Sequence, residues 1–80
     1  MKSQEGLDKR ELGKLLGARV RFLREKKGIS LREFETYEGA IDRQALAKIE
    51  KGLKIPTAFT LYRIARVIGV RVEEFFKDLD

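Results

Sequence analysis

The chain has 80 residues and contains no cysteine, histidine or tryptophan. This length fits one domain with a modest core. The missing residue types exclude a conventional zinc site, a nucleophile paired with histidine, a disulfide framework and a proton switch near neutral pH. So short a chain also leaves little wall for a water-excluding pocket built on carboxylates. We therefore predict that the protein is not an enzyme and needs no cofactor.

Basic residues outnumber acidic ones by 18 to 13, so the net charge is +5. Residues 1–27 hold nine basic and four acidic residues, and residues 43–72 hold seven and one. The segments 28–42 and 73–80 each hold one basic and four acidic residues. Two basic regions of this kind favour a polyanionic partner. Neither a secretory signal nor a membrane-spanning apolar run is evident, so we expect a cytoplasmic protein.

The first expected element is a helix that runs from about residue 8 or 10 to residue 27. Apolar residues recur there at three- and four-residue steps, which is the period of a helix with one buried face. These residues are Leu12, Leu16, Val20 and Leu23. Gly13 and Gly17 lower the helix propensity of its first turns. Residues 1–8 are expected to form a flexible N-terminal arm, and residues 9–80 the folded domain.

Two helices are expected in the middle of the chain. Ser30 followed by Glu33 is a capping box, and it predicts a second helix over residues 30–38. Asp42 is a good N-cap for a third helix over residues 42–51. The apolar residues of the third helix that we expect to face inward are Leu46, Ile49 and Leu53.

Thr57 is expected to cap a fourth helix that ends before Gly69, and residues 72–79 to form a short fifth helix. No strand is predicted, so the fold class is all-α. Adjacent Phe75 and Phe76 cannot both face the core of a helical domain. One of them is expected to join the core. The other, with Leu79, is a candidate dimer contact, and the alternative is that these side chains only cap a small core.

The third helix has an outward stripe that differs sharply from its apolar side. The stripe lies at helical spacing and consists of Arg43, Gln44, Ala47, Lys48 and Lys51. Arginine and glutamine can each make bidentate contacts to base edges, and small residues such as alanine allow close approach to a thymine methyl group. The stripe contains no carboxylate. These features predict a helix that enters a DNA major groove, although an ordinary solvated face is the alternative.

Three stretches of the chain resemble the Cro and phage-repressor type of helix-turn-helix DNA-binding domain, the family of regulators similar to those of xenobiotic response elements. The matching stretches are LGARVRFLREKKGIS (16–30), IDRQALAKIEKG (41–52) and IPTAFTLYRIARVIGVRVEEFF (55–76). The resemblance implies a compact five-helix domain of the lambda-repressor-like type, in which the second and third helices form the reading unit.

The resemblance also implies roles for individual residues. Positions that contact bases or line the groove in the family are occupied here by Arg43, Gln44, Ala45, Ala47 and Lys48. Positions that meet phosphates are occupied by Ser30 and Lys54, and Lys51 is expected to join them. Arg24 and Glu50 stand where the family has a structural ion pair, and the helical phases of both residues agree with that role.

The chain departs from the family pattern between the second and third helices. It is one residue longer there, which we place near Gly39 and Ala40. Glu35 stands where a small residue is usual, and a shift of one residue would bring Thr36 to that position and Tyr37 to an apolar one. The angle between the two helices is therefore not predicted.

The sequence thus predicts a regulator that binds specific double-stranded DNA, most simply a repressor that binds an inverted repeat as a homodimer. Two alternatives stay open. One is an interaction module with a protein partner, such as the DNA-binding antitoxin of a toxin–antitoxin pair. The other is a nucleic-acid binder that uses charge without reading bases.

Overall fold

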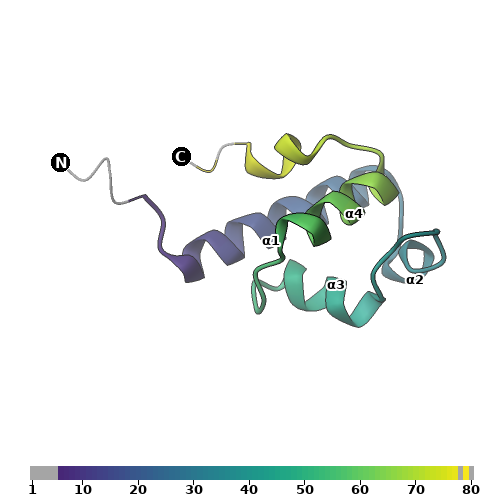
Figure 1. The fold of residues 1–80 in the computed structure, drawn as a ribbon, viewed down its shortest axis with the longest axis horizontal. Coiled ribbons are helices and arrows are strands. Elements are labelled where there is room, and N and C mark those ends of the chain that lie inside the picture. Colours follow the sequence, from purple (N-terminus) through teal and green to yellow (C-terminus); the bar gives the residue numbers. More distant parts are fainter. Residues whose placement is uncertain (1–5, 78, 80) are drawn as a thin grey trace.

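The computed structural model describes residues 6–77 and 79 as a bundle of short helices (Figure 1). Residues 1–5 of the predicted N-terminal arm lie outside this part. The elements are α1 (Lys9–Lys26), α2 (Leu31–Phe34), α3 (Arg43–Glu50), α4 (Ala58–Ile68) and the 3-10 turn η1 (Val72–Phe76). No strand occurs among the described residues. The predicted all-α class is confirmed, with four α-helices and a 3-10 turn in place of five helices.

The helices begin where polar side chains can bond the free backbone amides of the first turn. Asp8 and Glu11 form a capping box at α1, and Ser30 and Glu33 form another at α2. Asp42 accepts from Ala45 N at 2.8 Å at the start of α3. The caps predicted at Ser30, Asp42 and Thr57 are therefore confirmed. Such caps are each worth about 1 kcal/mol and fix where a short helix starts.

The second helix is much shorter than the predicted span 30–38, because α2 ends at Phe34. The chain then turns through Gly39, whose φ of +84° suits glycine, before α3 begins. Thr36 and Tyr37 are both exposed, so the one-residue shift that would bury them does not occur. Ala40 and Ile41 pack against the core instead. The prediction of a helix that reaches residue 38 was wrong because side chains distant in sequence, described below, bond to this turn.

A single apolar core joins all five elements. Its buried side chains are Leu16, Val20, Leu23, Phe34, Leu46, Ile49, Leu61, Ile64, Ala65, Ile68 and Phe75. The prediction that Leu53 faces inward was wrong, since 72% of its surface is exposed. The helix has already ended at Glu50, and Gly52 turns the chain with a φ of +78°. Leu53 therefore no longer lies on the inward face of α3.

The close packing of α1 on α3 depends on Gly17. A Cβ atom at this position would lie 2.1 Å from the carbonyl oxygen of Ile49 and 2.8 Å from that of Glu50. Only a residue without a side chain lets the two backbones approach so closely. Gly17 lowers the helix propensity of α1, but its lack of a side chain allows the short distance between α1 and α3. α2 also packs on α3, while η1 packs on α1 and α4.

Candidate nucleic-acid interface

The outward face of α3 is the part of the molecule that the sequence predicts to meet DNA. Leu46 and Ile49 are buried and anchor the helix to the core. The side chains that point away from the core and are exposed are those of Arg43, Gln44, Lys48 and Lys51. Ala47 lies within this stripe and is partly buried, whereas Ala45 lies on its flank, where it lines a hollow with Ile41 and Thr57. The structure therefore brings Arg43, Gln44, Ala47 and Lys48 onto one accessible surface and leaves Ala45 at its edge.

This face carries a net positive charge. Glu50 is the only carboxylate of α3, and its side chain is 5% exposed and bonded to Arg24. Asp42, just before the helix, accepts a hydrogen bond in the cap through one oxygen, and Glu35 partly offsets the charge of Arg43. The ammonium groups of Lys48 and Lys51 have no such neighbour on α3, so the local field stays positive. Such a surface attracts phosphates at long range and lets them be neutralised on contact.

Arg24 and Glu50 form a buried ion pair between α1 and the end of α3. Arg24 Nε and Nη2 donate to the two carboxylate oxygens of Glu50 at 2.8 and 2.9 Å, and Nη1 donates to Ile29 O at 2.7 Å. The hydrogen bond to Glu50 raises the pKa of Arg24 above its ordinary value, although burial acts in the opposite direction. The bidentate contact fixes α3 to α1.

Glu35 makes contacts with α3 that the sequence did not reveal. One of its carboxylate oxygens accepts from the backbone amide of Arg43 at 3.0 Å, and the other lies 3.5 Å from Arg43 Nε. Glu35 therefore bonds both the first turn of α3 and the side chain that is predicted to read bases. A carboxylate near a helix N-terminus also suits the helix dipole. The one related signal in the sequence was that Glu35 stands at a position where the resembled family usually has a small residue.

Arg63 of α4 supports the turn that precedes α3. Its Nε donates to Gly39 O at 2.8 Å and its Nη2 donates to Ala40 O at 3.0 Å. These bonds satisfy two carbonyls that the irregular turn would otherwise leave to solvent. They also fix this turn against a regular helix. No local sequence pattern signals this contact, because its partners lie more than twenty positions apart in the chain.

The predicted phosphate contacts lie at the two edges of the α3 face. Ser30 is exposed, and its hydroxyl oxygen accepts from Glu33 N at 3.0 Å. Lys54 is exposed in the loop after α3, where it shares a shallow hollow with Lys9 and Arg10 of α1. The first turn of α1 thus adds two cations beside Lys54. Sequence reasoning assigned those two residues no role.

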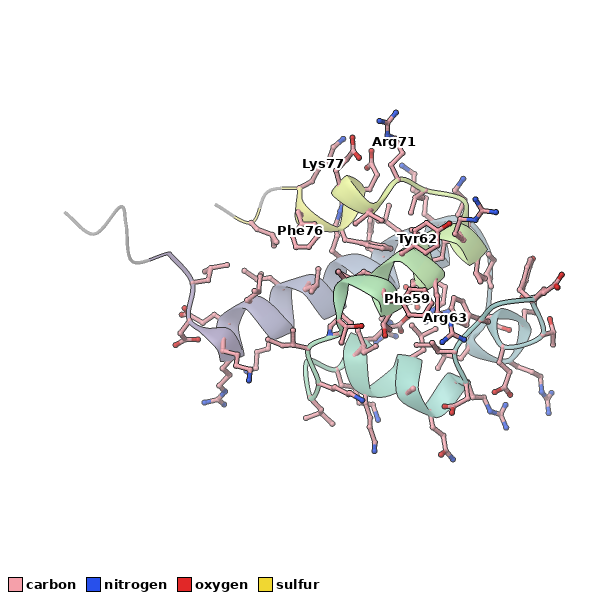
Figure 2. The ribbon with its side chains drawn as sticks, in the orientation of Figure 1. Phe59, Tyr62, Arg63, Arg71, Phe76 and Lys77 are labelled. Atoms are coloured by element: carbon pink, nitrogen blue, oxygen red, sulfur yellow. The ribbon has the colours of Figure 1, made fainter. Side chains whose placement is uncertain are left out.

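The predicted dimer contacts at the chain end divide into two kinds. Phe75 has no exposed surface and fills the core, so it is the one of the two phenylalanines that was expected to be buried and it is not available as a dimer contact. Phe76 is 44% exposed, and Leu79 is partly buried. Figure 2 shows Phe76 on η1, on the opposite side of the molecule from α3.

Among residues 6–77 and 79, no three histidine, cysteine, aspartate or glutamate side chains gather as a metal site would need. Within the same part of the chain, no helix has both the length and the apolar character to cross a bilayer.

Comparison with known proteins gives two matches. Residues 20–75 match the family described as helix-turn-helix. Over 70 residues the chain is 34% identical to the uncharacterized HTH-type transcriptional regulator y4dJ of Sinorhizobium fredii, and the match covers 88% of this chain and 90% of that relative. No solved structure matches the chain.

Proposed function

Because the chain belongs to the Cro/C1-type helix-turn-helix family of DNA-binding transcription regulators, we propose that it binds specific double-stranded DNA sequences through α3. The family membership predicted from the sequence is confirmed. We further propose that the protein acts as a repressor, by covering DNA that other proteins must reach. This role depends on binding alone and needs neither catalysis nor a cofactor.

The observation that carries the proposal is the composition of the exposed face of α3. It presents one guanidinium and one amide group near the start of the helix, at Arg43 and Gln44, and lysines toward its end. Arginine pairs best with guanine and glutamine with adenine in the major groove. A reading helix of this type contacts bases mostly through its N-terminal residues. Arg43 and Gln44 are therefore assigned to sequence choice, and Ala45 and Ala47 to close approach.

The remaining cations are assigned to the DNA backbone. Lys48 and Lys51 follow the base-reading residues along α3, and Lys54 continues the row into the next loop. Ser30 can donate its hydroxyl proton to a phosphate while its oxygen stays in the cap. Contacts of this kind fix orientation and supply affinity that falls with salt, but they do not distinguish sequences.

One helix of this length reads only a few base pairs, so we propose that a homodimer binds an inverted repeat. A two-fold dimer presents two reading helices about 34 Å apart on one face of the duplex. Each copy then reads one half-site. The second half-site adds the specificity that a single α3 lacks.

The test compares Arg43→Ala with Lys54→Ala on a panel of duplexes that differ by single base pairs. Loss of Arg43 should remove about 1–3 kcal/mol of discrimination at particular positions. Loss of Lys54 should weaken all duplexes alike and reduce the slope of log K against log salt by about one. Uniform losses from both substitutions would mean that Arg43 contacts only phosphate, and that the protein binds nucleic acid by charge.

A further inference from the structure

One outward face of α4 carries two exposed aromatic rings beside two guanidinium groups. It consists of Phe59, Tyr62, Arg63 and Arg66, at the i, i+3, i+4 and i+7 positions that form one stripe. The two rings are 66% and 50% exposed, and they stack with centroids 6.5 Å apart. The core side of the same helix is already filled by Leu61, Ile64, Ala65 and Ile68. We call the exposed stripe the α4 face; Figure 2 labels three of its members.

The order of side chains along the α4 face matters more than its composition. Both rings stand in the N-terminal half and both guanidiniums in the C-terminal half, with Arg63 5.7 Å from the Phe59 ring centre and Arg66 6.0 Å from that of Tyr62. If two such faces meet antiparallel, each ring of one lies opposite a guanidinium of the other. If they meet parallel, guanidiniums oppose guanidiniums and repel. Rings and guanidiniums attract by about 0.5–2 kcal/mol for each pair.

A two-fold axis perpendicular to a helix generates this antiparallel arrangement, and it brings the same patch of both copies together. Phe59 of one copy would lie opposite Arg66 of the other, and Tyr62 opposite Arg63. A hollow of about 280 Å³ beside Tyr62, lined by Glu38, Gly39, Arg63 and Arg66, gives the protruding Phe59 ring of the second copy a place to enter. Two antiparallel α4 faces can thus pair ring against guanidinium, with the hollow receiving Phe59.

The position of the α4 face also suits two reading helices on one duplex. In Figure 1, α3 lies on one side of α1 and η1 on the other, and α4 lies in front of α1. A contact through Phe76 on η1 would turn the two α3 helices away from each other. A contact through the α4 face leaves both on the same side. We therefore infer that a second copy of this chain docks on the α4 face; this inference rests on the proposed function.

The α4 face borders the turn that leads into the reading helix. Arg63, which lies over the Phe59 ring, also donates to the carbonyls of Gly39 and Ala40 in that turn. Covering the α4 face with a second copy removes water from around these bonds and strengthens them. Dimer formation is thereby coupled to the rigidity of the segment that orients α3.

The first experiment measures self-association by sedimentation equilibrium without DNA. Phe59→Ala and Arg66→Ala should each raise the dimer dissociation constant at least tenfold. Phe76→Ala, a matched loss of an exposed aromatic ring on η1, should leave it unchanged. All three side chains lie at the surface, so the substitutions should leave the fold intact, and thermal melting of each variant checks this. The inference is overturned if Phe76→Ala dissociates the dimer, if Phe59→Ala does not, or if the wild-type chain stays monomeric.

The second experiment tests the antiparallel register, using the fact that the chain has no cysteine of its own. Phe59→Cys and Arg66→Cys chains are mixed and treated with a short bifunctional thiol reagent. Cross-links between the two different variants should exceed those within either variant. Equal yields, or an excess of Phe59→Cys chains linked to each other, would contradict the register.

Binding to a single half-site separates docking on the α4 face from DNA reading by α3. The Phe59→Ala chain should still bind a single half-site with the base preference that depends on Arg43, because α3 is untouched. If Phe59→Ala keeps the wild-type self-association but loses half-site affinity, the α4 face contacts DNA and the inference is wrong. If wild-type protein shows no base preference on any duplex, the proposed function itself fails.

Discussion

Replacing Gly17 by alanine tests how closely α1 must approach α3. The new Cβ would lie 2.1 Å from Ile49 O, whereas ordinary contacts of a Cβ begin at about 3.4 Å. The two backbones must therefore separate by about 1.3 Å at this point, the difference between those distances. The obstructing atoms are backbone oxygens of the last turn of α3, so no side chain can rotate out of the way.

The expected cost follows from two opposing effects. Alanine gains about 1 kcal/mol of helix propensity over glycine. Overpacking a close-packed contact costs about 1–3 kcal/mol when side chains can adjust, and it costs more when a backbone must move. Separating α1 from α3 also stretches the Arg24–Glu50 pair. We expect a net loss of about 2–3 kcal/mol, which in a domain of this size lowers the melting temperature by roughly 10–20 °C.

Gly13→Ala is the matched control, because Gly13 lies one turn earlier on the same side of α1. Its added Cβ would meet Gly52 O and Ile55 Cγ1, both at 3.4 Å, which is ordinary contact. The propensity gain should then dominate, so that Gly13→Ala is neutral or stabilises by up to about 1 kcal/mol. Urea denaturation of both variants provides the comparison. Equal effects of the two substitutions, or a Gly17→Ala chain as stable as wild type, would show that the close approach of α1 to α3 does not depend on Gly17.

Three further predictions concern the scaffold around α3. Arg24→Ala leaves the buried Glu50 carboxylate without a partner and should cost about 3–5 kcal/mol in urea denaturation, whereas replacing both residues by methionine should cost less; the reverse order would contradict a buried-pair role. Glu35→Gln keeps an acceptor for the Arg43 amide but removes the charge that pairs with the Arg43 guanidinium. Base preference at the position read by Arg43 should therefore change, while the free energy of unfolding shifts by about 1 kcal/mol or less. An unchanged base preference would show that Glu35 does not position Arg43. Leu53→Ser should alter stability by less than about 0.5 kcal/mol because the side chain is exposed, whereas Leu46→Ala should cost about 2–5 kcal/mol; a large loss from Leu53→Ser would restore the original prediction that it is part of the core.

The elements that the sequence predicts well are those held by local interactions. The start of α1 near Asp8, the N-caps of the other helices and the left-handed glycine after α4 depend on residues a few positions apart, so the pattern contains the whole cause. The same holds for the apolar stripe of α4. The outward stripe of α3 also follows from period alone, once Leu46 and Ile49 are taken as buried.

The features that the sequence does not predict depend on distant partners. The early end of α2 reflects bonds from Arg63 to the next turn and from Glu35 to α3, and no local pattern encodes either. From the sequence, Gly17 only lowers the helix propensity of α1; its role appears when the carbonyl oxygens of α3 are seen to lie against it. Likewise, the sequence does not show that the aromatic residues of α4 are exposed, and only the structure places them at the surface beside two guanidiniums.

Base reading by α3 can be measured by selecting bound sites from a random duplex library and then competing them against unselected duplex. Reading by α3 predicts an enriched motif of two inverted half-sites with centres about 34 Å apart, and an affinity at least about 10³-fold above that for random DNA at physiological salt. Enrichment should disappear at one base position of each half-site with Arg43→Ala. Equal affinity for selected and random duplexes would mean that α3 does not read bases and that the protein binds DNA by charge alone.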